Sequence, residues 1–272
     1  MPTLISKYRR MAVVFFILLF FATFQKSGDA TFFGEVKTGL QNIASDRYGY
    51  SMYVPTGYTP DRTWPLVVAL HAEGGRGEDY IQSWIETAEK RGIIVFCPTY
   101  EHPRSGLPFE HDERLIKLKR SIQDQYEIDP NRILIAGFGT GGHYAFYLGF
   151  RYPKEFTSIA SVGNGFQGVL QKLFSYSYSE VYQLPVLMLL KPGDKAEDSE
   201  MSEQLNEIKN RGYLLEVVEA ENPKDLENPN TNSYVAEWFA QVSTQRETGL
   251  KERPFSVKQS FYEWVDNLLQ NR

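Results

Sequence analysis

Cysteine, positive charge and metal-binding spacings are all scarce in this sequence. Its 272 residues contain one cysteine, Cys97, so no disulfide can form within the chain and no cysteine-based zinc site is possible. Lys and Arg number 29 against 34 Asp and Glu, a net charge of −5, which gives no reason to expect a nucleic-acid partner. Histidines and carboxylates do not recur at ligand spacing, so we expect no metal and no cofactor.

The sequence also lacks an apolar run long enough to cross a membrane. The run at residues 11–24 falls short of the roughly 20 residues that a spanning helix needs. Lys7, Arg9 and Arg10 precede it, and small residues at 28 and 30 favour cleavage after Ala30. We therefore predict a signal peptide over 1–30 and a secreted, periplasmic or otherwise extracytoplasmic protein, which would contact a membrane only through this segment if it stayed uncleaved.

What is present is the composition of a folded domain, 42% hydrophobic and 14% aromatic. Short apolar runs alternate with helical patterns, which favours an α/β fold with a doubly wound, mostly parallel sheet and helices on both faces. The expected strands are 64–70, 93–96, 133–136, 158–162, 185–190 and 214–218, with an antiparallel edge at 48–53. The expected helices are 78–91, a segment through 115–126, 141–150, 202–211, 234–242 and 257–269. We predict one domain over 31–272, with 243–272 as a C-terminal helical extension.

Three segments in this alternation indicate a chemical site. Residues 137–142 (Gly-Phe-Gly-Thr-Gly-Gly) follow one strand and precede a helix, and residues 70–75 (Leu-His-Ala-Glu-Gly-Gly) follow another strand. The third, 185–194, is a strand that ends in Lys-Pro-Gly-Asp. In this order they resemble secreted esterases with the α/β-hydrolase fold, of the polyhydroxybutyrate-depolymerase, feruloyl-esterase and phospholipase/carboxylesterase type.

The resemblance places the family's catalytic groups on named positions. The strand–turn–helix would carry the nucleophile at its apex, and Gly139 stands there in place of serine. Because glycine adopts positive φ without cost, the turn itself can persist. The backbone N–H groups of Ala72 and Thr140 would form the oxyanion hole, with His71 structural beside them. A Thr140 nucleophile is disfavoured, because it would put Phe138 where a small side chain is required.

The triad acid falls on Asp194, with Glu197 and Asp198 as alternatives. The family's triad histidine follows the acid, but all four histidines precede it and 194–272 contain none. His102 lies in a loop after a strand, near where ligands bind in such sheets. His111 is interpreted as a residue flanking a helix start, and His143 as a residue packed in the helix after the turn.

With neither serine nor a following histidine, we expect a catalytically inactive esterase relative that binds a small-molecule ester, a carbohydrate or a partner. One alternative is an active esterase with a non-standard constellation, in which Asp194 or a loop histidine activates water. A further alternative is a partner-binding module that uses an apolar face of the last helix, made of Phe261, Trp264, Val265 and Leu268.

Overall fold

The computed structural model describes residues 36–44, 49–101, 109–163, 183–193, 200–210, 212–222, 224, 226 and 229–247. The predicted signal segment 1–30 and the predicted helix 257–269, with its apolar face, lie outside these ranges. The division into a signal segment, one domain and a C-terminal extension therefore stays a prediction. Among the described residues, no helix is both long and apolar enough to cross a membrane.

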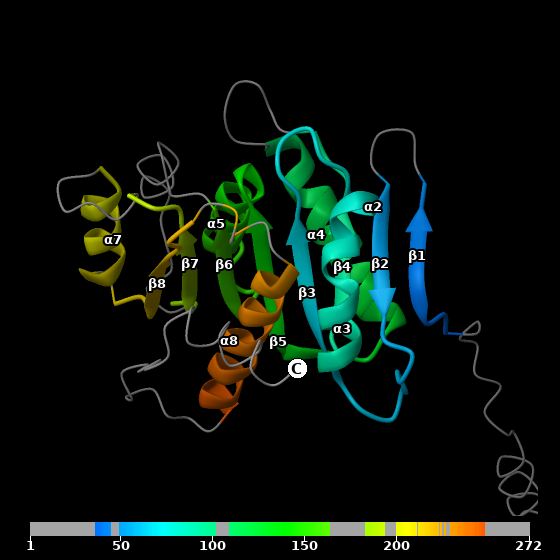
Figure 1. Ribbon diagram of the computed structural model, residues 1–272. Coiled ribbons are helices and arrows are strands. Elements are labelled where there is room, and N and C mark those ends of the chain that lie inside the picture. Colours follow the sequence, from blue (N-terminus) through cyan, green and yellow to red (C-terminus); the bar gives the residue numbers. More distant parts are fainter. Residues whose placement is uncertain are drawn as a thin grey trace, which may run out of the picture. The chain divides into compact units, whose positions relative to one another are not determined.

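An eight-stranded sheet forms the centre of the described fold, in the order β1-β2-β4-β3-β5-β6-β7-β8 (Figure 1). Its strands are β1 (Gly39–Ile43), β2 (Tyr50–Val54), β3 (Trp64–Leu70), β4 (Ile94–Pro98), β5 (Ile128–Phe138), β6 (Ser158–Val162), β7 (Val186–Leu190) and β8 (Leu215–Glu219). β2 pairs antiparallel with both β1 and β4, and all other pairs are parallel. The predicted mostly parallel sheet is confirmed.

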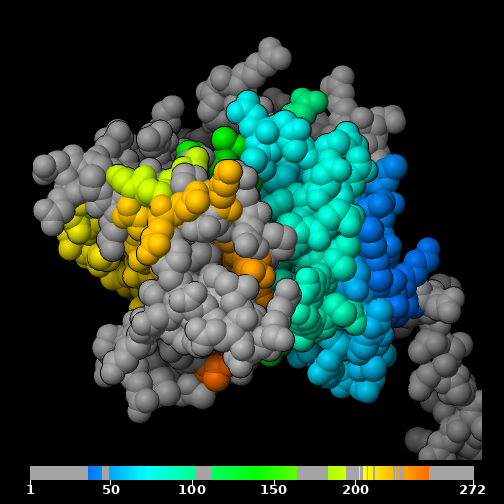
Figure 2. Space-filling model, viewed as in Figure 1, coloured from blue at the N-terminus to red at the C-terminus, as the bar shows by residue number. Residues whose placement is uncertain are grey.

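Helices cover both faces of this sheet. They are α2 (Gly77–Tyr80), the short 3-10 helix η1 (Ile81–Ser83), α3 (Ile85–Arg91), α4 (Phe109–Gln125), α5 (Thr140–Arg151), α7 (Glu200–Asn210) and α8 (Pro229–Glu247). Figure 1 shows α3 and α8 in front of the sheet and α4 and α5 behind it, and in Figure 2 the cyan segment with α2 and α3 forms a continuous part of the front surface. Every residue of β3 is buried, because this strand is covered on both sides.

Two of the predicted elements differ from the structure, one in its continuity and one in its place in the sheet. The predicted helix 78–91 is divided into α2, η1 and α3, with Trp84 between the last two. Its predicted end is confirmed, since Gly92 caps α3 in the left-handed conformation with φ 63° and ψ 50°. The segment 48–53, predicted as an antiparallel edge strand, corresponds to β2, which is antiparallel but lies inside the sheet between β1 and β4. The true edge is β1, whose Leu40 and Ile43 are 40% and 37% exposed.

The predicted strand 133–136 is longer in the structure, because residues 129–131 are also part of β5. The pairing of β3 with β5 shifts register between Trp64 and Leu66, so the strand accommodates Pro130 at an irregularity rather than ending there. The helix expected at 234–242 is longer and spans Pro229–Glu247. Neither difference changes the order of strands, because both lie at the ends of elements away from the pairing in the middle of the sheet.

Candidate functional site

The two central strands, β3 and β5, meet at a switch point of the topology. β4 comes between them in the sequence but pairs on the far side of β3, so the chain reverses direction across the sheet between β4 and β5. Ligands in open parallel sheets bind outside the carboxyl ends of the strands at such a point. The segments that leave these ends, residues 71–75 after β3 and 139–142 after β5, are two of the three expected to carry the site.

Gly139 forms the apex of a sharp turn between β5 and α5. Its φ of 56° and ψ of −126° are accessible to glycine and strained for other residues. The Gly139 N–H donates to the Val162 carbonyl at 2.8 Å, and its own carbonyl accepts from the Gly142 N–H at 2.9 Å. The positive φ expected at the apex is confirmed, and no hydroxyl projects from it.

Glycines on either side of the apex allow strand and helix to pass closely. A Cβ built on Gly137 would lie 2.0 Å from the Gly141 carbonyl oxygen. One built on Gly141 would lie 2.3 Å from the Leu70 carbonyl oxygen at the end of β3. Because both neighbours are backbone atoms, they cannot move aside without shifting the strand. The requirement for small residues two before and two after the apex is therefore confirmed.

The loop after β3 is fastened to the turn by the side chain of Thr140. Its Oγ1 accepts the Glu73 N–H at 2.6 Å. Within the loop, the Gly75 N–H donates to the Ala72 carbonyl at 3.0 Å, closing a tight turn in which Gly74 has a φ of 75°. A backbone donor directed at the turn, that of Glu73, is thus already bonded inside the protein.

Ala72 faces Gly139 across this junction. A Cβ added to Gly139 would lie 3.3 Å from the Ala72 Cβ, which is tighter than ordinary contact. A side chain at the apex therefore has to displace the Ala72 methyl group by a few tenths of an ångström. The two small residues fit each other and leave little space for a nucleophile.

His71 is buried and serves the backbone around it. The Tyr100 N–H approaches His71 Nε2 at 3.3 Å, and His71 Nδ1 lies 2.8 Å from the Ala72 carbonyl. Since an amide N–H only donates, Nε2 accepts and the ring proton sits on Nδ1, in the neutral tautomer. The Tyr100 ring stacks on the imidazole at 4.2 Å, and its hydroxyl donates to the His71 carbonyl at 2.6 Å. This arrangement fits the structural role expected for His71.

The remaining predicted site residues are not brought together in the described structure. Asp194, its alternatives Glu197 and Asp198, and His102 lie outside the described residues. His111 lies in α4, where its side chain is not described, and His143 is half-buried in α5.

The loop after β7 is joined to the last residue of β8 by a hydrogen bond. The Gly193 N–H donates to the Glu219 carboxylate at 2.5 Å. Figure 2 shows the corresponding yellow-green and amber segments side by side on the surface. Ala220, Glu221 and Asn222 follow β8, where a triad histidine was expected, and none of these described residues supplies an imidazole.

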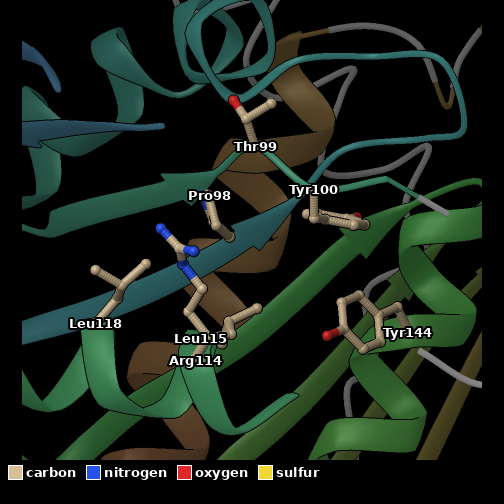
Figure 3. A pocket seen from close by; sticks show the side chains of 7 residues that line it. All are labelled: Pro98, Thr99, Tyr100, Arg114, Leu115, Leu118 and Tyr144. Atoms are coloured by element: carbon tan, nitrogen blue, oxygen red, sulfur yellow. The ribbon is translucent and has the colours of Figure 1, made fainter. Parts of the chain in front are cut away.

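A pocket opens beside the end of β4, between this strand, α4 and α5 (Figure 3). It is a small hollow that is partly open to solvent, and it is lined by Pro98, Thr99, Tyr100, Arg114, Leu115, Leu118 and Tyr144. Tyr100 joins it to the loop after β3 through the stack on His71. The pocket therefore shares a wall with the junction at Gly139.

The tyrosines of this wall are neutral, and a buried carboxylate supports one of them. Tyr144 donates to Asp112 Oδ1 at 2.9 Å, and Asp112 is 1% exposed with Arg151 Nε 3.9 Å from its second oxygen. Burial, and then the Asp112 charge, raises the pKa of Tyr144 above its ordinary value. Burial likewise raises the pKa of Tyr100. Neither hydroxyl ionises near neutral pH.

Sequence reasoning did not single out Arg114, Tyr100 or Tyr144. The one signal for Tyr100 was its place directly after β4, at the carboxyl edge of the sheet. Arg114 and Tyr144 belong to two helices, α4 and α5, and only the tertiary structure brings them to one pocket beside the end of β4. Among the described residues, no group of three or more His, Cys, Asp or Glu side chains is placed to hold a metal ion.

Residues 42–169, which include both central strands and the Gly139 turn, match an esterase family model ("Putative esterase"). No curated protein matches the sequence significantly. Solved structures match in large number, 1065 chains, so the fold is a common one and does not by itself choose a function.

Three of these structures show the range of relatives. A thermostable esterase is 19% identical with a TM-score of 0.50, over 78% of this chain and 61% of that one. The S-formylglutathione hydrolase FrmB of Staphylococcus aureus is 10% identical with a TM-score of 0.53, over 77% and 100%. A fungal esterase from Rhizomucor miehei is 12% identical with a TM-score of 0.54, over 78% and 84%. The described chain thus has the α/β-hydrolase fold, while it spans under two thirds of the thermostable esterase.

Proposed function

Because residues 42–169 match an esterase family model and the chain has the α/β-hydrolase fold, we propose that it is an inactive relative of the esterases that binds a ligand without hydrolysing it. The observation that carries the proposal is the conformation of Gly139. The turn has the strand–turn–helix shape and the positive φ of a nucleophile position, yet its apex residue has no attacking atom.

Two further features support the loss of chemistry. A serine triad needs an imidazole to accept the nucleophile's proton, and no histidine occurs in residues 194–272. His71 is close to the turn, but its Nε2 faces the Tyr100 N–H and the ring is buried. It is therefore not available as a base for water or for a hydroxyl at position 139.

A backbone N–H next to the expected oxyanion donors is bonded inside the protein. Catalysis of acyl transfer requires backbone N–H groups that point at an empty position for the developing oxyanion. The N–H of Glu73, the residue after Ala72, instead donates to the Thr140 hydroxyl at 2.6 Å. This contact holds the loop and the turn together, so the junction acts as a structural joint. The proposed ligand is a small-molecule ester or a carbohydrate that binds near this junction.

Ester hydrolysis and fluorophosphonate labelling test this proposal. We expect the purified protein to give no turnover of nitrophenyl acetate or butyrate above background and no labelling. Gly139→Ser should remain unlabelled, because the base is missing and the new side chain meets Ala72. The double variant Gly139→Ser with Ala72→Gly relieves that contact and isolates the missing base.

Gly139→Ala is the matched control, since it adds the same Cβ and the same backbone strain without a hydroxyl. Turnover by the unmodified protein that Asp194→Ala abolishes would establish the active alternative and overturn the proposal. Strong labelling of Gly139→Ser, with none of Gly139→Ala, would show that a base is present after all.

Export is the second part of the proposal. It rests on the basic residues before the apolar run 11–24 and on the small residues that precede Thr31. Mass spectrometry of the protein recovered from its native host should give an N-terminus at Thr31. A chain that begins at Met1 and sediments with membranes would instead establish an uncleaved anchor.

A further inference from the structure

The outer side of β1 has no partner strand among the described elements. β1 pairs with β2 only, and Figure 1 shows it as the outermost strand at its end of the sheet. Proteins usually keep such an edge from pairing with charged side chains, proline or bulges. No residue of β1 is charged or proline, and its register with β2 runs through without a bulge. The edge is therefore open to another strand.

The hydrogen bonds between β2 and β4 fix the direction of the backbone groups in β2. The Thr99 N–H donates to the Gly49 carbonyl at 2.8 Å, one step beyond the pair of Tyr50 with Pro98. Hydrogen-bonded and non-hydrogen-bonded pairs alternate along an antiparallel ladder. The backbone groups of Gly49 thus face β4, and those of Tyr50 face β1. Pro98 agrees with this phase, because it has no N–H to donate to Tyr50.

The same alternation continues into β1. Ile43 stands opposite Tyr50 and bonds to β2, as do the residues two and four positions before it. The N–H and C=O groups of Leu40 and Asn42 therefore point away from the sheet. Neither backbone has a hydrogen-bond partner within the part of the chain that the structure describes. β1 offers two donors and two acceptors to a further strand.

β1 is held in place without such a partner. Gln41 Nε2 donates to the Lys37 carbonyl at 2.8 Å and to the Tyr126 hydroxyl at 3.1 Å. The Ser51 hydroxyl donates to Asn42 Oδ1 at 2.7 Å. Because these contacts already order the strand, pairing at its outer side costs little conformational entropy.

We propose that β1 pairs antiparallel with β1 of a second copy of this chain, about a two-fold axis at Gln41. Leu40 of each copy then lies opposite Asn42 of the other, and each of these two equivalent pairs exchanges both N–H···O bonds. Ile43 of each copy lies opposite Gly39 of the other, which has no side chain to obstruct it. The two copies of Leu40 become diagonal neighbours on one face, roughly 7–8 Å apart.

Charge and exposure favour a second copy as the occupant. The chain carries a net charge of −5, but β1 carries none, so two copies meet here without opposed like charges. Pairing also covers part of Leu40 and Ile43, which are 40% and 37% exposed. Five residues from each copy make a contact below the roughly 1,200–2,000 Å² of stable interfaces, so the dimer should dissociate on dilution.

Sedimentation velocity of the purified protein from about 10 μM to about 1 mM tests the pairing. The protein should pass from monomer to dimer over this range and form nothing larger, because each copy has one β1. Leu40→Lys should weaken association at least about tenfold, since two ammonium groups become diagonal neighbours. Leu214→Lys is the matched control: Leu214 is 38% exposed and precedes β8 at the opposite edge, so this variant should associate like the parent.

A charge exchange separates strand pairing from the loss of an apolar side chain. Leu40→Glu alone should associate as weakly as Leu40→Lys. An equimolar mixture of the two variants should recover the dimer, because opposite charges then stand on the diagonal.

Hydrogen exchange of the unmodified protein reports on the register directly. The amides of Leu40 and Asn42 should exchange fast in dilute protein and slowly in concentrated protein, whereas those of Gln41 and Ile43, bonded to β2, should be protected in both.

Each of four results would overturn the proposal. They are a monomer at every concentration, a dimer that Leu214→Lys weakens and Leu40→Lys does not, and a mixture of charged variants that stays monomeric. The fourth is protection of the Leu40 and Asn42 amides in dilute protein, which would show that another segment of the same chain covers the edge. Ester turnover bears on none of them, so the pairing and the proposed inactivity stand or fall separately.

Discussion

A buried ion pair between Lys119 of α4 and Glu155, which follows α5, allows a sharp test of how this fold is held together. Lys119 is 2% exposed, and its Nζ lies 2.9 Å from Glu155 Oε2 and 2.8 Å from the Glu155 carbonyl oxygen. Glu155 is 14% exposed and also accepts from Arg120, whose side chain is 61% exposed. The lysine therefore depends on Glu155 alone among these charges, whereas the glutamate has two cations.

This asymmetry predicts unequal costs for the two single changes. Glu155→Gln leaves the Lys119 ammonium buried without its counter-charge, which we expect to cost about 3 kcal/mol, the lower end for breaking a buried pair. Lys119→Met keeps the apolar stem and leaves Glu155 with Arg120, so about 1 kcal/mol is expected. The double variant should resemble Lys119→Met, which makes the magnitude of the coupling energy about 3 kcal/mol.

The pH dependence follows from the two pKa values. Burial raises the pKa of Glu155, but hydrogen bonds from Arg120 and Lys119 outweigh it and the net shift is downward. The stability from this charge is therefore present above the unfolded pKa of about 4.3 and is lost as pH falls through the folded value. Burial lowers the pKa of Lys119 despite Glu155, so Glu155→Gln should recover stability as pH rises toward about 10.

Urea unfolding followed by tryptophan fluorescence measures these differences, with Arg120→Gln as an exposed control that should change stability by less than about 1 kcal/mol. Equal costs for Glu155→Gln and Lys119→Met would refute the asymmetry. Single costs that add up in the double variant would show that the two side chains are not coupled.

Three further predictions follow from the site and its surroundings. Gly141→Ala should lower stability by about 3 kcal/mol, because its Cβ would lie 2.3 Å from a β3 carbonyl oxygen; Gly57→Ala, with nothing within 4 Å, is the control in thermal unfolding. Thr140→Val should remove the acceptor of the Glu73 N–H at a cost of about 1 kcal/mol, seen as faster hydrogen exchange of that amide; unchanged exchange would contradict the joint. Burial raises the pKa of Glu216, so the stability that its carboxyl contributes is present below about pH 4.3 and is lost as pH rises through the folded pKa. Glu216→Gln should therefore be at least as stable as the parent at pH 7. A lower Tm of this variant at pH 7 would refute the upward direction of the pKa shift.

The sheet was predictable because its central strands are buried on both faces. β3 and β6 match their predicted ranges, since continuous apolar runs indicate such strands. β1 was missed because it is a partly exposed edge with weak alternation. β5 was predicted too short because the pairing with β3, which residues 129–131 alone do not reveal, carries the strand through Pro130.

The absence of a nucleophile at the apex of the turn was likewise predictable from the sequence. Gly137, Gly139 and Gly141 stand at the spacing that a tight strand–turn–helix requires. That these residues have no side chain is known from the sequence and does not depend on how the chain packs. The absence of serine there, and of histidine in 194–272, is a fact of the same kind.

Contacts between distant segments were decided only by the tertiary structure. That Thr140 holds Glu73, that Tyr100 stacks on His71 and that Arg114 reaches a pocket beside β4 all depend on β3 lying between β4 and β5. Periodicity along the chain reports which residues are buried, but strand order determines which buried residues meet. The sequence alone therefore determined what the Gly139 turn has lost, and the packing of the sheet decided what now surrounds it.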